Sequence, residues 1–192
     1  MAAIKEPKKK YTQKEYLDAE RKAELKSEYF KGEIFAMSGV SRTHNIINGN
    51  LFALLHSKLK GKDCQPYSKD MRLHIPVNTL YTYPNIVVAC GKEAFLDNSF
   101  DTLLNPVFIA EVLSPSTTDY DTGGKFALYR SIESLKEYWT ISSFEYRLQK
   151  FVKNISNNTW VLSETINPND SILMESFGLT ILLQEVYEGV TF

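Results

Sequence analysis

The sequence predicts a single-domain α/β protein in which a central mixed sheet is flanked by helices. Residues 86–90 and 107–113 are almost continuously apolar, which is typical of strands at the centre of a sheet that is covered on both faces. Segments with apolar residues at helical spacing occur among these strand-like segments, as in α/β and α+β proteins with one sheet. The length of 192 residues suits one domain.

Local patterns place the individual elements. Thr12 and Glu15 have the spacing of a capping box at the start of a helix. Lys31 and Gly32 lie between two apolar runs and predict the turn of a hairpin. Gly61 follows a long segment of helical periodicity and predicts its end. In chain order we expect a disordered basic tail at 1–10 and then one domain over 11–192. The first half of the domain is expected to contain a helix at about 12–25, a hairpin at 29–37, a helix over 41–61, and a half-exposed strand before 76 with a turn at 78–81. The second half is expected to contain strands at 86–90 and 107–113 with a loop at 91–104 between them, a helix after 125, a strand at 137–141, a hairpin of 146–152 and 159–162, and a short helix at 182–186.

Composition excludes several classes of protein. No segment approaches the roughly 18 apolar residues of a transmembrane helix, and the lysine-rich N-terminus lacks the apolar core of a secretory signal. The formal net charge of −1 gives no sign of a broad basic surface for nucleic acid, although a metal-dependent nuclease can hold its cations in the cleft. Cys64 and Cys90, the only two cysteines, lack CxxC spacing, and we interpret them as buried thiols in a reducing compartment. We therefore expect a cytoplasmic protein that does not bind membranes.

Two polar residues interrupt the apolar strands. Asn85 lies at the start of the strand at 86–90, and Glu111 lies within the strand at 107–113. A buried glutamate is costly unless a positive or hydrogen-bonding group meets it. Lys125, on the helix that follows, is the nearest candidate partner in the sequence. A plainer interpretation of the same residues is an internal ion pair without any metal.

These residue types suit the hydrolysis of a phosphodiester. The reaction needs charge neutralised on the phosphate, a water made nucleophilic and a stabilised leaving oxygen, and hard divalent cations held by carboxylates supply all three. A nearby lysine can orient the water or stabilise negative charge. Glu111 and Lys125 match this arrangement, whereas Asn85 stands where an aspartate would be expected. An amide oxygen can still ligate a hard cation, so the change predicts weakened metal binding rather than its complete loss.

Six sequence blocks resemble a known family. They read YFKGEIFAMSG, SRTHNIINGNL, SKDMRL, TYPNIVV, IAEVLSPST and DYDTGGKFALYRSIESLKEYW. The blocks resemble the Uma-two family of restriction-endonuclease-like proteins, which belongs to the PD-(D/E)XK nuclease superfamily, and the resemblance extends from Thr12 to Val186. It implies a restriction-endonuclease-like fold and a DNA endonuclease that depends on Mg²⁺ or Mn²⁺. It also implies a homodimer, because many nucleases of this fold pair to cut both strands.

The resemblance further implies roles for individual residues. The superfamily lysine would stand two residues after the strand acid, at Leu113, but the family places a lysine on the next helix, at Lys125. The implied catalytic residues are Glu111, Lys125 and Asn85, the implied metal ligands are Glu111, Asn85 and Asp70, and the implied supporting residues are Glu33 and His44.

Two functions therefore compete. One is a Mg²⁺-dependent DNA endonuclease weakened by Asn85, and the other is an inactive module of the same fold that binds nucleic acid or a protein partner. Asn85 favours the module, whereas the presence of both Glu111 and Lys125 favours the enzyme. For Asp70 and Glu33 the plainer interpretation is a solvent-exposed charge, and for His44 it is a histidine on a helix surface.

Overall fold

A computed structural model describes residues 9–37, 39–114 and 120–192 of the chain. Residues 1–8, which make up most of the predicted tail, lie outside the described residues. Lys9 and Lys10 are exposed and belong to no helix or strand.

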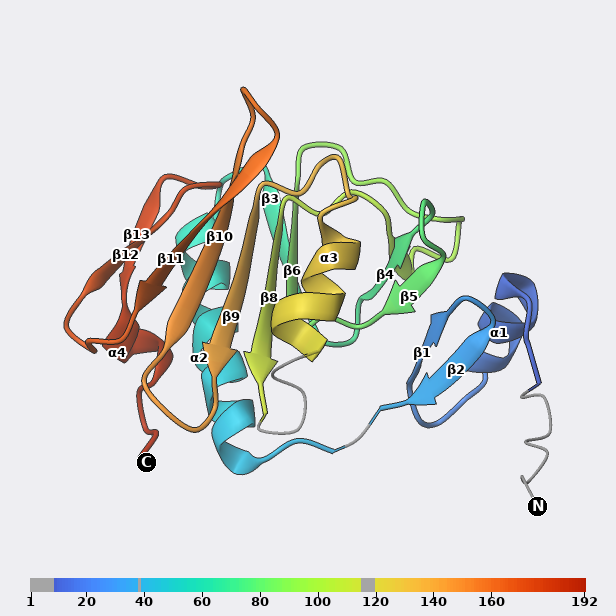
Figure 1. The fold of residues 1–192 in the computed structure, drawn as a ribbon, viewed down its shortest axis with the longest axis horizontal. Helices are drawn as coiled ribbons and strands as arrows, with labels where there is room; N and C mark the ends of the chain where they lie inside the picture. Colours follow the sequence, from blue (N-terminus) through green and yellow to red (C-terminus); the bar gives the residue numbers. More distant parts are fainter. Residues whose placement is uncertain (1–8, 38, 115–119) are drawn as a thin grey trace, which may run out of the picture.

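The described chain alternates strands with a few helices (Figure 1). The helices are α1 (Gln13–Glu20), α2 (Arg42–Leu59), the π-helix η1 (Tyr120–Lys125), α3 (Phe126–Tyr129) and α4 (Leu183–Val186). The strands are β1 (Ser27–Phe30), β2 (Glu33–Ala36), β3 (Cys64–Ser68), β4 (Arg72–Ile75), β5 (Leu80–Thr82), β6 (Ile86–Cys90), β7 (Thr102–Leu103), β8 (Phe108–Leu113), β9 (Glu137–Ser142), β10 (Leu148–Asn154), β11 (Thr159–Thr165), β12 (Ser171–Met174) and β13 (Leu179–Leu182).

The central sheet is mixed and has the strand order β11-β10-β9-β8-β6-β3. Strands β8 and β9 are parallel, and the other neighbours are antiparallel. Helix α2 covers one face and α3 the other (Figure 1). Coverage on both faces explains why all six residues of β8 and all six of β9 are buried. The predicted α/β fold with a mixed central sheet is confirmed.

Alternation along β8 decides which side chains face which helix. Phe108, Ala110 and Val112 belong to the apolar cluster that contains the buried face of α2. Ile109 belongs to the cluster on the other face, with Tyr129 of α3. Because successive side chains point to opposite faces of a strand, Glu111 faces the α3 side.

A second sheet, β2-β1-β5-β4-β7, carries the N-terminal part of the chain. Tyr16 of α1 packs against Tyr29 and Tyr81, with ring centroids 5.2 and 5.3 Å away. The capping box at Thr12 and the hairpin turn are confirmed, and Lys31 and Gly32 have φ of 48° and 90°, the left-handed backbone that a tight hairpin turn requires. This sheet holds the β1–β2 hairpin beside the central sheet.

Four predictions about elements were wrong in part, and one hairpin was missed. Helix α1 ends at Glu20 rather than near residue 25, strand β5 begins inside the predicted turn at 78–81, and β7 lies in the predicted loop at 91–104. The hairpin of β12 and β13 was not predicted. Strand β4 is wholly buried rather than half-exposed, because Arg72 Nη2 forms an ion pair with Asp101 (2.8 Å) and His74 Nδ1 lies 3.0 Å from the Leu80 carbonyl oxygen. Alternation of charged and apolar residues misleads when the charges have buried partners.

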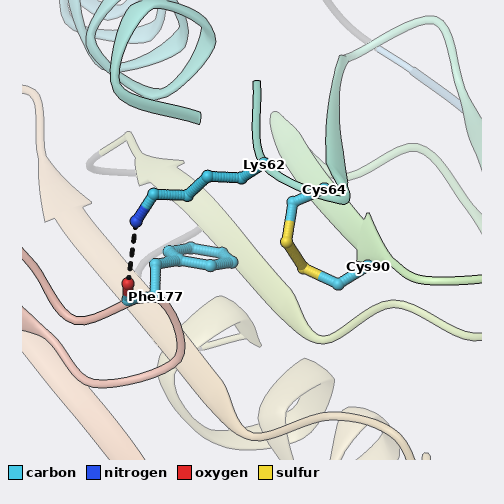
Figure 2. The surroundings of a disulfide bond; sticks show 4 residues. All are labelled: Lys62, Cys64, Cys90 and Phe177. Atoms are coloured by element: carbon cyan, nitrogen blue, oxygen red, sulfur yellow. Dashed lines mark hydrogen bonds between the residues drawn. A yellow bond between two sulfur atoms is a disulfide. The ribbon is translucent and has the colours of Figure 1, made fainter. Parts of the chain in front are cut away.

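The interpretation of the cysteines as free thiols was also wrong. Cys64 and Cys90 form a disulfide between β3 and β6 (Figure 2). The two residues are directly opposite each other in the antiparallel pair, with Cα atoms 3.9 Å apart, so strand pairing brings their sulfurs together. The ring of Phe177 lies beside the bridge, and Lys62 donates to the Phe177 carbonyl oxygen (Figure 2). Sequence spacing carries no sign of this register.

Among the described residues, no helix combines the length and apolar character needed to cross a membrane.

Candidate active site

A cleft of about 510 Å³ lies between the β1–β2 hairpin and the central sheet. Figure 1 shows the hairpin, the first turn of α2 and the carboxyl end of β8 on the same side of the molecule. Polar residues that line the cleft come from β1, α2, β8 and η1 and from the residues directly before β1 and β6; they include Lys26, Glu28, His44, Asn85, Glu111 and Lys125. The cleft therefore gathers residues that are far apart in the sequence.

Glu111 is the acid at the floor of the cleft, and only 3% of its surface is exposed. Tyr129 Oη donates a hydrogen bond to Oε1 (2.8 Å), and the Asn85 backbone N–H donates to Oε2 (3.1 Å). Lys125 Nζ lies 3.2 Å from Oε1. These three donors offset the desolvation of the carboxylate and fix its orientation.

Lys125 joins two carboxylates. Its Nζ lies 3.2 Å from Glu111 Oε1 and 3.0 Å from Glu28 Oε1, and the residue is 7% exposed. Lys125 and Tyr129 are four residues apart on the continuous helical segment of η1 and α3, so both side chains reach Glu111 from one face. The expected pairing of Glu111 with Lys125 is present, and Lys125 is not a surface lysine.

Glu28 of β1 was missed by the sequence analysis. Its side chain is 14% exposed, and it accepts a hydrogen bond from Thr82 Oγ1 besides pairing with Lys125. Glu33, which the resemblance singled out, lies on the same hairpin but at the turn, where its carboxylate is 3.8 Å from Lys10 Nζ. Both acids belong to strand-like segments beside the same turn, and the sequence holds no signal that separates them.

Asn85 connects Glu111 to α2. Its Oδ1 accepts a hydrogen bond from the Val112 backbone N–H (2.9 Å), and its Nδ2 lies 3.3 Å from His44 Nε2. Because an amide N–H must meet an acceptor, this contact fits a neutral His44 with its proton on Nδ1. Burial and the nearby Lys69 hold the His44 pKa below its usual value, which agrees with the neutral form.

The structure brings some predicted residues together and leaves others apart. Asn85, Glu111, Lys125 and His44 all line the cleft, and His44 is buried rather than on the helix surface. Asp70 does not line the cleft; its side chain is 74% exposed and pairs with Lys26.

The cleft offers hard oxygen donors for a divalent cation. The donors are the carboxylates of Glu28 and Glu111 and the amide oxygen of Asn85, and Lys125 reduces their combined charge to a single negative charge. Across the ranges 9–37, 39–114 and 120–192, no cluster of three Asp, Glu, His or Cys side chains is placed to hold a metal. Mg²⁺ commonly takes only one or two carboxylates and completes its coordination with water and substrate phosphates. The donor set fits such an open site.

Comparison with known proteins places this geometry in context. The Uma2 family, described as "Putative restriction endonuclease", matches residues 13–184. Two proteins of Synechocystis are similar to the chain: "Uncharacterized protein sll1609" is 38% identical over 84% of this chain and 90% of its own length, and "Uncharacterized protein slr1290" is 34% identical over 95% and 94%. The fold is similar to the crystal structure of a "putative nuclease belonging to DUF820" from Anabaena variabilis, with a TM-score of 0.76, 17% identity and coverage of 92% of this chain and 97% of that one.

Proposed function

The chain belongs to the Uma2 family, whose description is "Putative restriction endonuclease", and from this premise we propose that it is a metal-dependent DNA endonuclease whose reaction takes place in the cleft around Glu111. The observation that carries the proposal is the buried arrangement in which Lys125 Nζ lies within 3.2 Å of Glu111 and 3.0 Å of Glu28 at the floor of that cleft. Buried charges of this kind cluster at functional sites.

In this proposal Glu111, Asn85 and Glu28 hold Mg²⁺ or Mn²⁺. When bound, the cation neutralises charge on the scissile phosphate and lowers the pKa of a water. Lys125 orients the attacking water and stabilises the charge that develops on the phosphate oxygens. Tyr129 keeps the Glu111 carboxylate turned toward the cleft.

The residues around this group act by positioning. Neutral His44 holds the side chain of Asn85 through its Nε2. Asp70 holds Lys26 at the edge of the cleft through their ion pair, and Glu33 supports the hairpin turn through Lys10. DNA as the substrate, and a homodimer that cuts both strands, belong to the same proposal.

Asn85 weakens the proposed metal site. A carboxylate at this position would add a unit negative charge, and its gross attraction to a divalent cation is about 8 kcal/mol at roughly 4 Å and an effective dielectric constant of about 20. Much of that energy is returned when the ion is hydrated instead. We therefore expect binding of metal at millimolar rather than micromolar concentration.

Cleavage of supercoiled plasmid in Mg²⁺ or Mn²⁺ tests the proposal. Glu111→Gln keeps the shape of the side chain and removes its charge, and we expect cleavage to fall by about 100-fold. Glu175→Gln is the matched control, because Glu175 is an exposed acid that pairs with Lys150 outside the cleft. Equal cleavage by wild type and Glu111→Gln would show that the site is elsewhere.

The second candidate, a non-catalytic nucleic-acid-binding module, is favoured by one observation. Asn85 Oδ1 is already hydrogen-bonded to the Val112 N–H, which leaves one lone pair for a metal. Calorimetric titration separates the two functions: the enzyme predicts heat of Mg²⁺ or Mn²⁺ binding that is lost in Glu111→Gln, and the module predicts no heat at millimolar metal.

A further inference from the structure

The β1–β2 hairpin presents an aromatic side chain to the cleft. Phe35 is directly opposite Glu28 in the antiparallel register, and side chains of directly opposed residues lie on the same face of the sheet, about 5 Å apart at Cβ. Glu28 reaches Lys125 from this face. The ring of Phe35 therefore lies beside the Glu28–Lys125–Glu111 group.

The face that carries Phe35 is apolar and open. Phe35 is 46% exposed and Met37, two residues further on, is 40% exposed, and both line the cleft. On the opposite face of the hairpin Tyr29 is only 5% exposed, because it packs against Tyr16. Packing among the described residues accounts for Tyr29 but leaves the position of Phe35 unexplained, and exposed apolar groups that gather in a cleft mark a binding surface.

Positive charges lie along the same edge. Lys26, directly before β1, donates through Nζ to the Lys69 carbonyl oxygen (3.1 Å) and pairs with the exposed Asp70, and the exposed Lys69 also lines the cleft. An aromatic face flanked by two lysines complements a nucleotide, whose base is apolar on its faces and whose phosphates are anionic.

We propose that Phe35 is a stacking platform for an unpaired nucleobase, so that the cleft takes single-stranded or locally unpaired DNA in preference to intact duplex. Base faces are covered by neighbouring base pairs inside a duplex, so only an unpaired or extruded base can stack on the ring. A base is joined to its phosphate through one sugar, and a base on Phe35 accordingly places its phosphate near Glu28 and Lys125. The proposal rests on the proposed function for the identity of the polymer.

Fluorescence anisotropy tests the preference without any cleavage. A labelled 12-nucleotide single strand, the matching duplex and the same duplex with a one-nucleotide bulge are titrated with protein in excess chelator. Wild type is expected to bind the single strand and the bulged duplex about tenfold more tightly than the intact duplex, within the range for one base–aromatic stack. Equal affinity for all three would overturn the proposal.

Variants assign the preference to the ring. Phe35→Ala should bind the single strand about tenfold more weakly, Phe35→Leu should show nearly the same loss because it keeps apolar bulk without a π-face, and Phe35→Trp should retain affinity. Ile34→Ala is the matched control, since Ile34 is the neighbouring residue, is 37% exposed and points to the other face. Equal losses in Phe35→Ala and Ile34→Ala, or full affinity in Phe35→Leu, would refute stacking.

Failure of this inference and failure of the proposed function give different results. Phe35-dependent binding of the single strand without cleavage in Mg²⁺ would refute the nuclease and support the stacking platform. Metal-dependent cleavage of duplex at the same rate as single strand would support the nuclease and refute the platform.

Discussion

Replacing Lys125 with Met is predicted to destabilise the fold and to make its stability depend on divalent metal. Lys125 is 7% exposed, and its Nζ lies 3.0 Å from Glu28 and 3.2 Å from Glu111. Met is unbranched and similar in size, but it leaves the two carboxylates without a cation between them. Removing one partner of a buried ion pair typically costs about 3–5 kcal/mol, and we expect a loss in this range at neutral pH.

The metal dependence follows from the same geometry. Without the ammonium, the two carboxylates offer two full negative charges to a divalent cation at the place that Lys125 Nζ occupies. A ligand that binds only the folded state at 100 times its Kd adds about 2.7 kcal/mol of stability. Saturating Mg²⁺ or Mn²⁺ should thus recover much of the loss in Lys125→Met and add less to wild type.

Urea unfolding, measured in chelator and at metal concentrations raised in 10-fold steps, gives both the loss of stability and its recovery by metal. The double variant Lys125→Met with Glu111→Gln is the control, because it removes the repulsion together with the ammonium and should regain stability in chelator. A loss below about 1 kcal/mol in Lys125→Met, the value of an exposed ion pair, would refute the view that these charges form a buried group. An equal metal response in wild type and variant would refute the view that Lys125 and the metal compete for the two carboxylates, and no response in either protein would refute the metal site.

Two further predictions concern the scaffold. The Cys64–Cys90 bridge closes a segment with a sequence separation of 26, and its reduction should lower the free energy of unfolding by about 3.5 kcal/mol if the bridge acts by restricting the unfolded chain. Urea unfolding with and without reductant measures this loss, and an unchanged midpoint would contradict the prediction. Hydrogen bonds from Arg21, with Arg72 nearby, hold the pKa of Asp101 below its usual range. Its stabilisation is therefore present above the unfolded-state carboxyl pKa of about 4 and lost as pH falls below it. The stability difference between wild type and Asp101→Asn should shrink on acidification, and a difference that is constant from pH 7 to pH 3 would contradict this cause.

Local patterns in the sequence were sufficient for the central strands β6 and β8 and for α2. Continuous apolar runs predicted β6 and β8, and helical periodicity with Gly61 predicted α2, which ends at Leu59. These strands are buried on both faces and the helix is buried along one stripe, so the pattern of apolar residues alone predicts which of their side chains are buried.

Elements whose burial depends on distant partners could not be predicted in the same way. Arg72 in β4 is buried because Asp101 and Thr102, at the start of β7 and about 30 residues away in the chain, contact its guanidinium group. The disulfide of Cys64 and Cys90 depends on the register of β3 against β6. In both cases the interacting residues are too far apart in the sequence for a local pattern to reveal their contact.

The candidate site shows the same division. Glu111 could be identified from the sequence because a carboxylate buried in an apolar strand is costly unless a positive group pairs with it. The pairing with Lys125 was predicted for that reason. Glu28 lies in a half-buried strand where an acid is ordinary, and only the tertiary position of the hairpin brings it to Lys125.

The central claim is that Asn85 and Glu111 belong to one metal-dependent hydrolytic site. The most direct test of this claim is the rate of DNA cleavage in Mg²⁺, measured for Asn85→Asp, Glu111→Gln and the double variant. The account predicts that Asn85→Asp cleaves at least about tenfold faster than wild type, since the added charge stabilises the bound cation by more than 1.4 kcal/mol. It also predicts that Glu111→Gln abolishes this gain in the double variant. A gain that persists without the Glu111 carboxylate, or cleavage that is indifferent to both substitutions, would contradict the account.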